Sequence, residues 1–454
     1  MIRMKRTRPA VAGKKKMKNH LVEFFLTNDK GAKGSSLQIN YTRNCYCDVM
    51  GIRSVGNYEK VLNESGNPLN ANISNLLEVS CWNVRVGVGY KKVYYLQTKS
   101  GSILCYREDL GQFYAVLTNK GASQVFPVTG KMEDWIAVCS RTGLFLVSTD
   151  GIEYKRVTNH DTMGAGAFFK HRLFIGGKGG LVKYSAPEDY FNFTPSDDAG
   201  GEIVISNCSG ELIAMKTHQD ALYLFFQSGI VRLEIGGDPS KFYAEKLDYT
   251  GGEIFPRTIC ACQSGVYFLG SNGFYRLNGK KIEYLDALIN IVPKYTGEEG
   301  CAVFKNWPVI RFRAGGVNQN VVITENGKSF FFLEGLSRLG GNEGELLFID
   351  GKSEVSRMAD CGTNAYEGVC ALYKTNFGCA GKKRLDCLRF YGEGSFRLDM
   401  WWANCYFSRV FQFDNGIAEW KANALELSED FQIELYLSIN SRIWKVEAEF
   451  KTWE

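Results

Sequence analysis

The chain has 454 residues, of which 45% are hydrophobic and 23% charged, a balance typical of folded globular proteins and not of disordered ones. Its longest apolar runs, such as residues 330–333, are strand-sized and fall short of the roughly 18 residues that a membrane helix needs, so we expect no membrane-spanning segment. The net charge of +5 comes from the first 18 residues, which carry eight basic side chains before the first acid and leave the remainder at −3. A basic nucleic-acid-binding face over the whole protein is therefore excluded, because such binding draws on many phosphate contacts.

Residues 1–19 are expected to form a flexible basic arm. Its candidate contacts with an acidic partner surface or a phosphate backbone are Lys14, Lys15, Lys16 and Lys18, and the alternative is a solvated arm without a partner. The arm lacks the apolar region of a secretory signal, so we expect no export. The 14 cysteines are dispersed along a large chain, and we expect them to be reduced thiols.

Residues 20–363 repeat one pattern, an aromatic strand, a polar turn with glycine and a second strand. The first strands of these hairpins start 37–49 residues apart. That spacing is typical of propeller blades, each a four-stranded sheet around a central channel. The sequence therefore predicts a β-propeller with six or seven blades, because the last hairpin is weak and could instead be a connector. The hairpins include Tyr94, Ile136, Leu173, Leu222, Val266, Val309 and Leu346.

One turn within this region, residues 148–154, resembles the Asp-box turn of sialidase-like propellers. It contains Asp150 and Gly151, the aspartate and glycine that brace such a hairpin. The alternative is an ordinary Asp-Gly turn.

Residues 364–454 have a different character, with long strands in which apolar and polar residues alternate. Such alternation gives each strand one buried and one solvated face, which predicts a separate β-sandwich. Its aromatic segment supplies a candidate partner interface, since exposed Trp and Tyr are typical of binding hot spots. The alternative is that these rings are covered by a loop or by the propeller, and in either case one ring of the Trp pair should face the core and the other away from it. The interface candidates are Trp401, Trp402, Tyr406 and Phe407.

No pattern in the chain indicates catalysis, a cofactor or a metal. The four histidines form no zinc-binding helix motif, and Cys45/Cys47 and Cys260/Cys262 lack the spacing of a metal knuckle. The segment ending in Gly327-Lys328-Ser329 lacks the leading glycine of a phosphate-binding loop, since Val322 stands there. We therefore expect a protein that is not an enzyme and has no catalytic, cofactor-binding or metal-binding residues.

Segments between residues 168 and 290 resemble the tail hub, or nozzle, propeller proteins of tailed bacteriophages. These are of the packaged-DNA stabilisation and tail tubular protein type. The resemblance is carried by Arg172-Leu173-Phe174, by residues 184–193 (Tyr-Ser-Ala-Pro-Glu-Asp-Tyr-Phe-Asn-Phe), by Gly251-Gly252 and by residues 268–275. Residues 373–385 similarly resemble the entry to the C-terminal sandwich of such proteins.

Membership of this group implies a virion structural protein, assembled in the host cytoplasm and located in the tail. It implies a homo-oligomer, expected to be a hexamer, that extends the head-to-tail connector and encloses phage DNA without sequence-specific binding. Portal or adaptor proteins would be partners above it, and tail fibre, spike or needle proteins below. The alternative is an independent propeller that binds glycans or a receptor, as lectins and adhesins do. A hydrolase is less favoured, because the arginines and the tyrosine nucleophile of a sialidase cannot be assigned.

Overall fold

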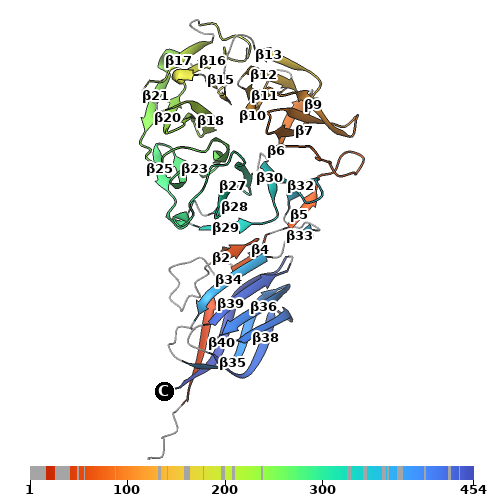
Figure 1. Ribbon diagram of the computed structural model, residues 1–454, viewed down its shortest axis with the longest axis vertical. Helices are drawn as coiled ribbons and strands as arrows, with labels where there is room; N and C mark the ends of the chain where they lie inside the picture. The colour runs from red at the N-terminus through yellow and green to blue at the C-terminus, as the bar shows by residue number, and fades with distance from the viewer. Residues whose placement is uncertain are drawn as a thin grey trace, which may run out of the picture. The chain divides into compact units, whose positions relative to one another are not determined.

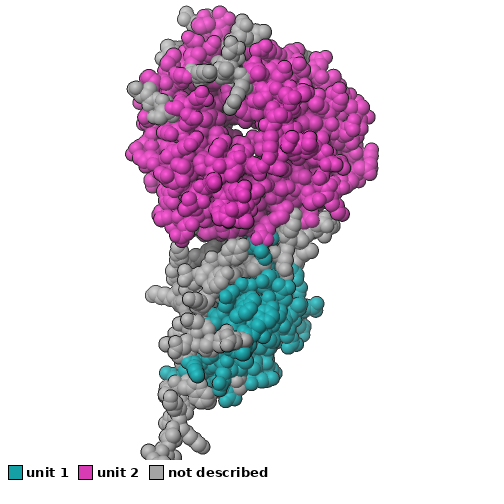
Figure 2. All heavy atoms as spheres, viewed as in Figure 1, with its two compact units in different colours: residues 1–56, 367–454 teal, residues 57–366 magenta. Residues whose placement is uncertain are grey.

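A computed structural model describes residues 17–25, 41–48, 51–55 and 57–453, with short gaps within the last range (87, 131–133, 141, 158–163, 177, 196–199, 207–209, 237–238, 325–326, 328, 341–344, 360–363, 366–367, 376–381, 403–404, 428–430 and 439). The chain divides into two compact units, coloured separately in Figure 2. Unit 1 contains residues 1–56 and 367–454, and unit 2 contains residues 57–366.

Unit 2 is a β-propeller (Figure 1). Five of its blades are four-stranded antiparallel sheets whose strands follow one another in the chain, and a sixth blade likewise has four consecutive strands that pair antiparallel in order. In chain order, the first blade contains β6(Leu76–Val86), β7(Gly89–Thr98), β8(Ile103–Arg107) and β9(Gln112–Leu117), and the second contains β10(Ala122–Val128), β11(Trp135–Ser140), β12(Gly143–Ser148) and β13(Tyr154–Val157). The third contains β14(Ala165–Phe169), β15(Arg172–Gly176), β16(Leu181–Tyr184) and β17(Gly201–Val204), and the fourth contains β18(Leu212–His218), β19(Ala221–Phe226), β20(Gly229–Glu234) and β21(Tyr243–Leu247). The fifth contains β22(Cys260–Cys262), β23(Gly265–Gly270), β24(Gly273–Asn278) and β25(Lys281–Tyr284), and the sixth contains β26(Gly300–Phe304), β27(Trp307–Ala314), β28(Val317–Thr324) and β29(Ser329–Leu333).

The seventh blade is assembled from both ends of the unit. It contains β30(Ser337–Gly340), β31(Leu347–Ile349), β32(Val355–Met358) and the short β33(Asn364–Ala365), and β5(Asn57–Lys60) from the start of the unit lies between β32 and β33. Arg357 Nε lies 2.6 Å from Glu59 Oε1, which adds an ion pair to this closure. Within the described residues the propeller therefore has seven blades, and the weak last hairpin is a blade.

The propeller core lies between neighbouring blades. Each buried cluster combines apolar side chains from two adjacent sheets; one contains Val138 of β11 with Tyr95 of β7. The ring is closed by a cluster that joins Leu347 and Val355 of the seventh blade to Leu96 of the first. A single sheet cannot bury both of its apolar faces, and this stacking covers both of them.

Glycine fixes the tight hairpin at the tip of the fifth blade. Gly273 has φ +138°, and a Cβ atom there would lie 2.7 Å from the ring of Tyr284. The Asn272-Gly273 turn therefore depends on a residue without a side chain.

Unit 1 is a β-sandwich with two sheets. One sheet has the order β3(Cys45–Asp48), β4(Gly51–Ser54), β40(Arg442–Trp453), β35(Lys383–Glu393) and β38(Ile417–Leu427), with β1(Met17–Phe25) also paired to β40. The other has the order β2(Tyr41–Arg43), β34(Gly368–Thr375), β39(Phe431–Leu437), β36(Ser395–Trp402) and β37(Cys405–Gln412). Their inner faces bury one cluster that includes Phe390, Phe396, Leu435 and Val446. The alternation predicted one buried face for each strand, and β39 confirms it by burying every second residue.

This arrangement corrects the predicted domain boundaries. Residues 20–56 were expected in the propeller, but the strands described there pair with the C-terminal strands of the sandwich, β1 with β40 and β2 with β34. The predicted arm also ends earlier than residue 19, because β1 begins at Met17. Residues 1–16 lie outside the described residues.

Helical structure in the described part of the chain consists of single 3-10 turns, so no helix there is long and apolar enough to cross a membrane. The turns are η1(Lys178–Gly180), η2(Pro239–Lys241), η3(Pro256–Thr258) and η4(Asp286–Leu288).

Candidate functional site

The sequence-predicted interface residues divide between the two sheets of the sandwich. Lys14, Lys15 and Lys16 lie outside the described residues, whereas Lys18 is exposed on β1. The aromatic candidates lie on the β36–β37 hairpin of the other sheet. The structure therefore does not bring Lys18 and the aromatic residues together on one sheet.

The four aromatic candidates point to opposite faces of their sheet. Trp402 and Phe407 pack against the sandwich core. Trp401 is paired with Tyr406 on the other face, with ring centroids 5.1 Å apart, and Tyr406 is 57% exposed. The expectation that one ring of the Trp pair faces the core and the other faces away is confirmed, and the outward pair of Trp401 and Tyr406 is available for contact.

Polar side chains on the same face of the sheet form a connected network. Arg397 lies over the ring of Tyr436, 3.9 Å from its centroid, and its Nε is 3.3 Å from Asp399 Oδ1. Ser408 donates a hydrogen bond to the same oxygen at 2.6 Å, which helps to satisfy a carboxylate that is only 4% exposed. Tyr436 donates to Glu434 at 2.6 Å; burial, and then this bond, raise the pKa of Tyr436 to about 12. The face is thus a pre-ordered polar surface with an aromatic pair, and β37 is the last strand in the order of its sheet.

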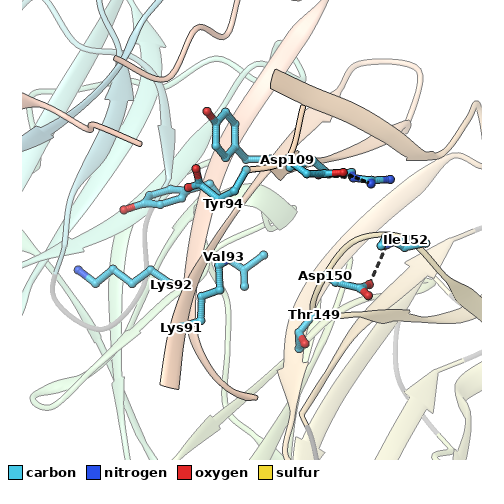
Figure 3. A pocket seen from close by; sticks show the side chains of 11 residues that line it. Lys91, Lys92, Val93, Tyr94, Asp109, Thr149, Asp150 and Ile152 are labelled. Atoms are coloured by element: carbon cyan, nitrogen blue, oxygen red, sulfur yellow. Dashed lines mark hydrogen bonds and ion pairs between the residues drawn. The ribbon is translucent and has the colours of Figure 1, made fainter. Parts of the chain in front are cut away.

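Sequence reasoning missed a pocket between the first two blades of the propeller, with a volume of about 250 Å³ (Figure 3). Figure 3 shows Lys91, Lys92, Val93 and Tyr94 of β7 on one side and Thr149, Asp150 and Ile152, from the turn after β12, on the other. The only signal in the sequence was the turn that resembles an Asp-box.

That turn is held by its own aspartate. Asp150 Oδ1 accepts a hydrogen bond from the backbone N–H of Ile152 at 2.9 Å. A Cβ on Gly151 would lie 2.4 Å from Cys105 Sγ, so the turn is pressed against the neighbouring blade. Lys92 forms an ion pair of 2.5 Å with Glu345, and Arg107 pairs with Asp109. The pocket combines charges of both signs with two tyrosines, a lining that suits a small polar ligand.

The central channel of the propeller is visible as a hollow in unit 2 (Figure 2). A pocket of about 90 Å³ is lined by polar groups from several blades, which include Glu78, Lys216 and Arg257. Arg257 forms an ion pair with Glu78. Gln124 links three blades, since it donates to the carbonyl of Met215 at 3.0 Å and accepts from the N–H of Gly166 at 3.2 Å. The channel is bridged by side chains of opposite charge.

Residues 184–193, which carry the family resemblance, have a structural part in the propeller. Tyr190 is buried, stacks edge-on against Phe168 with centroids 5.5 Å apart, and donates to the carbonyl of Thr129 at 2.5 Å. Ser185 is also buried and accepts a hydrogen bond from the N–H of Leu173 at 2.9 Å. The segment joins the second and third blades.

The residues of the described part that belong to the types used by metal sites form no cluster of three or more. Nine cysteines whose side chains are described are thiols that form no disulfide (Cys45, Cys81, Cys105, Cys139, Cys260, Cys262, Cys301, Cys387 and Cys405).

The geometry defines an all-β protein with a β-propeller and a β-sandwich. No family model matches the chain, and no curated protein matches it. Among solved structures, it is similar to virginiamycin B lyase from Staphylococcus aureus, at 14% identity over 64% of this chain and 97% of that one, with a TM-score of 0.43. It is also similar to the WD40 domain of Neurospora crassa Pan2, at 9% identity over 65% and 98%, with a TM-score of 0.43. A third is PorZ of the Porphyromonas gingivalis type-IX secretion system, at 10% identity over 70% and 45%, with a TM-score of 0.39. At these identities and TM-scores, the similarities say nothing about activity or partners.

Proposed function

We propose that this protein is a structural subunit of the tail hub, or nozzle, of a tailed bacteriophage. The observation that carries the proposal is the pairing of a β-propeller with a β-sandwich in one chain, which is the pair of domains implied by the resemblance of residues 184–193 and 373–385 to that group. Residues 184–193 are engaged in joining blades, so what is shared is part of the scaffold. A rigid scaffold without catalysis is the role that this arrangement supports.

The hub role needs a lumen wide enough for DNA, whereas in the propeller polar side chains of different blades pair with each other, as Arg257 does with Glu78. The DNA passage would therefore be enclosed between copies of the chain, in a ring that we propose to be a hexamer. Such a ring would lie in the virion tail, between portal or adaptor proteins and a fibre, spike or needle protein.

The outward face of the β36–β37 hairpin is the proposed contact surface for a neighbouring copy of the chain in this ring. Trp401 and Tyr406 offer aromatic contact area, and the ordered Arg397, Asp399 and Glu434 around them reduce the entropy lost on binding.

The experiment is to measure the mass of the purified full chain by mass photometry at several concentrations and to image the particles by electron microscopy. We expect rings with a central lumen and a mass six times that of the chain. The matched variants are Tyr406→Ser, which should shift the population toward smaller species, and Tyr114→Ser, at an exposed tyrosine of the propeller, which should not. A chain that stays monomeric at every concentration would refute the hub role.

A second candidate function is an independent glycan- or receptor-binding propeller, favoured by the pocket between the first two blades. Tyr94 and Tyr106 offer aromatic surfaces, and Lys91 and Thr149 offer polar contacts to a compact ligand. Binding of free glycans to a monomer, weakened by Tyr94→Ala, would support this function over the hub role.

A further inference from the structure

Two cysteines meet on neighbouring blades at the wall of the propeller channel. Cys260 lies on β22, the first strand of the fifth blade, and Cys301 lies on β26, the first strand of the sixth. Each thiol donates a hydrogen bond to a backbone carbonyl of the other blade, Cys260 Sγ to Ala302 at 3.2 Å and Cys301 Sγ to Ile259 at 3.4 Å. Because each bond reaches the residue next to the other cysteine, the two side chains are neighbours across the boundary between the blades.

The two thiols differ in access to solvent. Cys301 is partly exposed and lines the channel cavity, whereas Cys260 is only 3% exposed and lies behind it. A small reagent that enters the channel would therefore meet Cys301 first.

The surroundings also give the two thiols different reactivity. The neighbouring Cys260 thiol lowers the pKa of Cys301, and Lys216 and Arg257 act in the same direction against burial and Glu78. The Cys301 thiol, followed by burial, raises the pKa of Cys260 well above its usual range. Since the thiolate is the reactive form, Cys301 has the character of an attacking thiol and Cys260 that of a resolving thiol.

We propose that Cys260 and Cys301 form a dithiol modification site, which a low-molecular-weight disulfide such as oxidised glutathione converts into a covalent link between the fifth and sixth blades. The Cys301 thiolate attacks one sulfur of the reagent, the reagent's S–S bond breaks, and one thiolate leaves and takes up a proton. Cys260 then loses its proton and attacks the Cys301 sulfur of the mixed disulfide, and a second thiolate leaves. Two protein thiols are oxidised and one disulfide is reduced to two thiols, so atoms and electrons balance.

The other thiols with described surroundings lack this combination. Cys105 and Cys139 are fully buried, and burial raises the pKa of each to about 12. The Cys262 thiol is near Ser264 Oγ at 3.3 Å and packs into the cluster that joins the fifth and sixth blades. Cys405 is exposed on β37, so it serves as an internal reference for a thiol that is accessible but has no resolving thiol described beside it.

The test treats the folded full chain, under conditions that keep it native, with increasing oxidised glutathione and maps the products by non-reducing peptide mass spectrometry. We expect a peptide linked through Cys260 and Cys301 that dithiothreitol cleaves, together with a higher thermal midpoint. In Cys260→Ser, a glutathione adduct should accumulate on Cys301, because nothing resolves it. In Cys301→Ser, both the link and the adduct should be lost, while Cys139→Ser, as the matched control at a buried thiol, should behave as the wild type.

If the linked peptide does not form in the wild-type chain, the proposal is wrong; a glutathione adduct that accumulates on Cys260 in Cys301→Ser would contradict Cys301 as the attacking thiol. Should a serine variant fail to fold, the wild-type chain still decides: iodoacetamide must label Cys301 at least tenfold faster than Cys139. Equal labelling of these two cysteines would overturn the assignment.

Discussion

Phe407 of β37 stacks on Trp420 of β38, with ring centroids 4.1 Å apart and an angle of 16° between the planes, although the two strands belong to different sheets of the sandwich. The stack connects the sheets close to the aromatic segment. It places Phe407 in the core and leaves its neighbour Tyr406 outside. Substitutions at these two adjacent residues can therefore distinguish a loss of stability from a loss of binding.

Phe407→Ala should lower the free energy of unfolding by about 2–4 kcal/mol, because it leaves a cavity and removes the stack. Tyr406→Ala should lower it by less than about 1 kcal/mol, since the ring is already largely in solvent. Chemical denaturation monitored by tryptophan fluorescence measures both values. Similar losses in the two variants would contradict the placement of these rings.

Substitutions of the two adjacent tryptophans should likewise have different effects, measured both on stability and on assembly. Trp402→Ala should cost about 3 kcal/mol of stability, because Trp402 packs on the core. Trp401→Ala should leave the thermal midpoint nearly unchanged and reduce the fraction of chains in oligomers. Intact assembly, together with equal destabilisation by both changes, would mean that partners bind elsewhere.

Tyr190→Phe should destabilise the propeller by about 0.5–1.5 kcal/mol, the value of the hydrogen bond to the carbonyl of Thr129, which would lose its donor. Tyr190→Ala should cost several times more, because the ring is buried between the second and third blades. Thermal denaturation distinguishes the two. A Phe variant as damaged as the Ala variant would show that the hydroxyl, and not packing, fixes this segment.

Burial raises the pKa of the Cys139 thiol to about 12, which predicts a dependence of stability on pH. Below about pH 8.5, the thiol is protonated in both the folded and the unfolded chain, and its contribution is fully present. As the pH rises toward 12, only the unfolded thiol loses its proton, so this contribution falls. The stability advantage of the wild type over Cys139→Ala should therefore shrink by about 2 kcal/mol between pH 8 and pH 10.5, measured by urea denaturation. An advantage that does not change with pH would mean that the folded thiol also ionises.

Closure of the propeller by β5 should make the ring depend on residues 57–60. A chain of residues 57–366 should unfold in one cooperative transition. Removal of residues 57–60 should lower its thermal midpoint by several degrees or more, because β32 and β33 lose their shared partner and Arg357 loses Glu59. Equal midpoints for the two chains would show that the seventh blade is stable without the N-terminal strand.

Pairing between strands that are close in the chain could be predicted from the sequence. Every hairpin identified by its Ser-Gly, Asn-Gly or similar turn became the central pair of a blade, as in β23 and β24 around Gly273, because the two strands lie within a few residues of each other. The alternation in β39 likewise predicted the sandwich, since the order of residues in a single strand determines which of its faces is buried.

Pairing between strands that are far apart in the chain could not be predicted. Tyr58 pairs with Met358, and Leu21 pairs with Glu449, and no local pattern in strands this short records which distant edge they complete. The pocket near Asp150 was missed for the same reason, because its two walls come from different blades. The Cys260–Cys301 contact also depends on the stacking of neighbouring blades, so spacing within one blade could not indicate it.

The closure of the seventh blade also bears on the order in which the protein can fold during its synthesis. Residues 57 and 365 are paired, so the whole propeller is inserted at one point of the sandwich. At about 5–20 residues per second, a ribosome needs roughly 15–60 seconds to make the propeller residues. During that time, β1 to β4 have emerged, but β34, β35 and β40 do not yet exist. The propeller can fold with β5 before the partners of these early strands have been synthesised. The early strands keep unpaired edges during that time, so they are the part of the nascent chain with the greatest need of a chaperone.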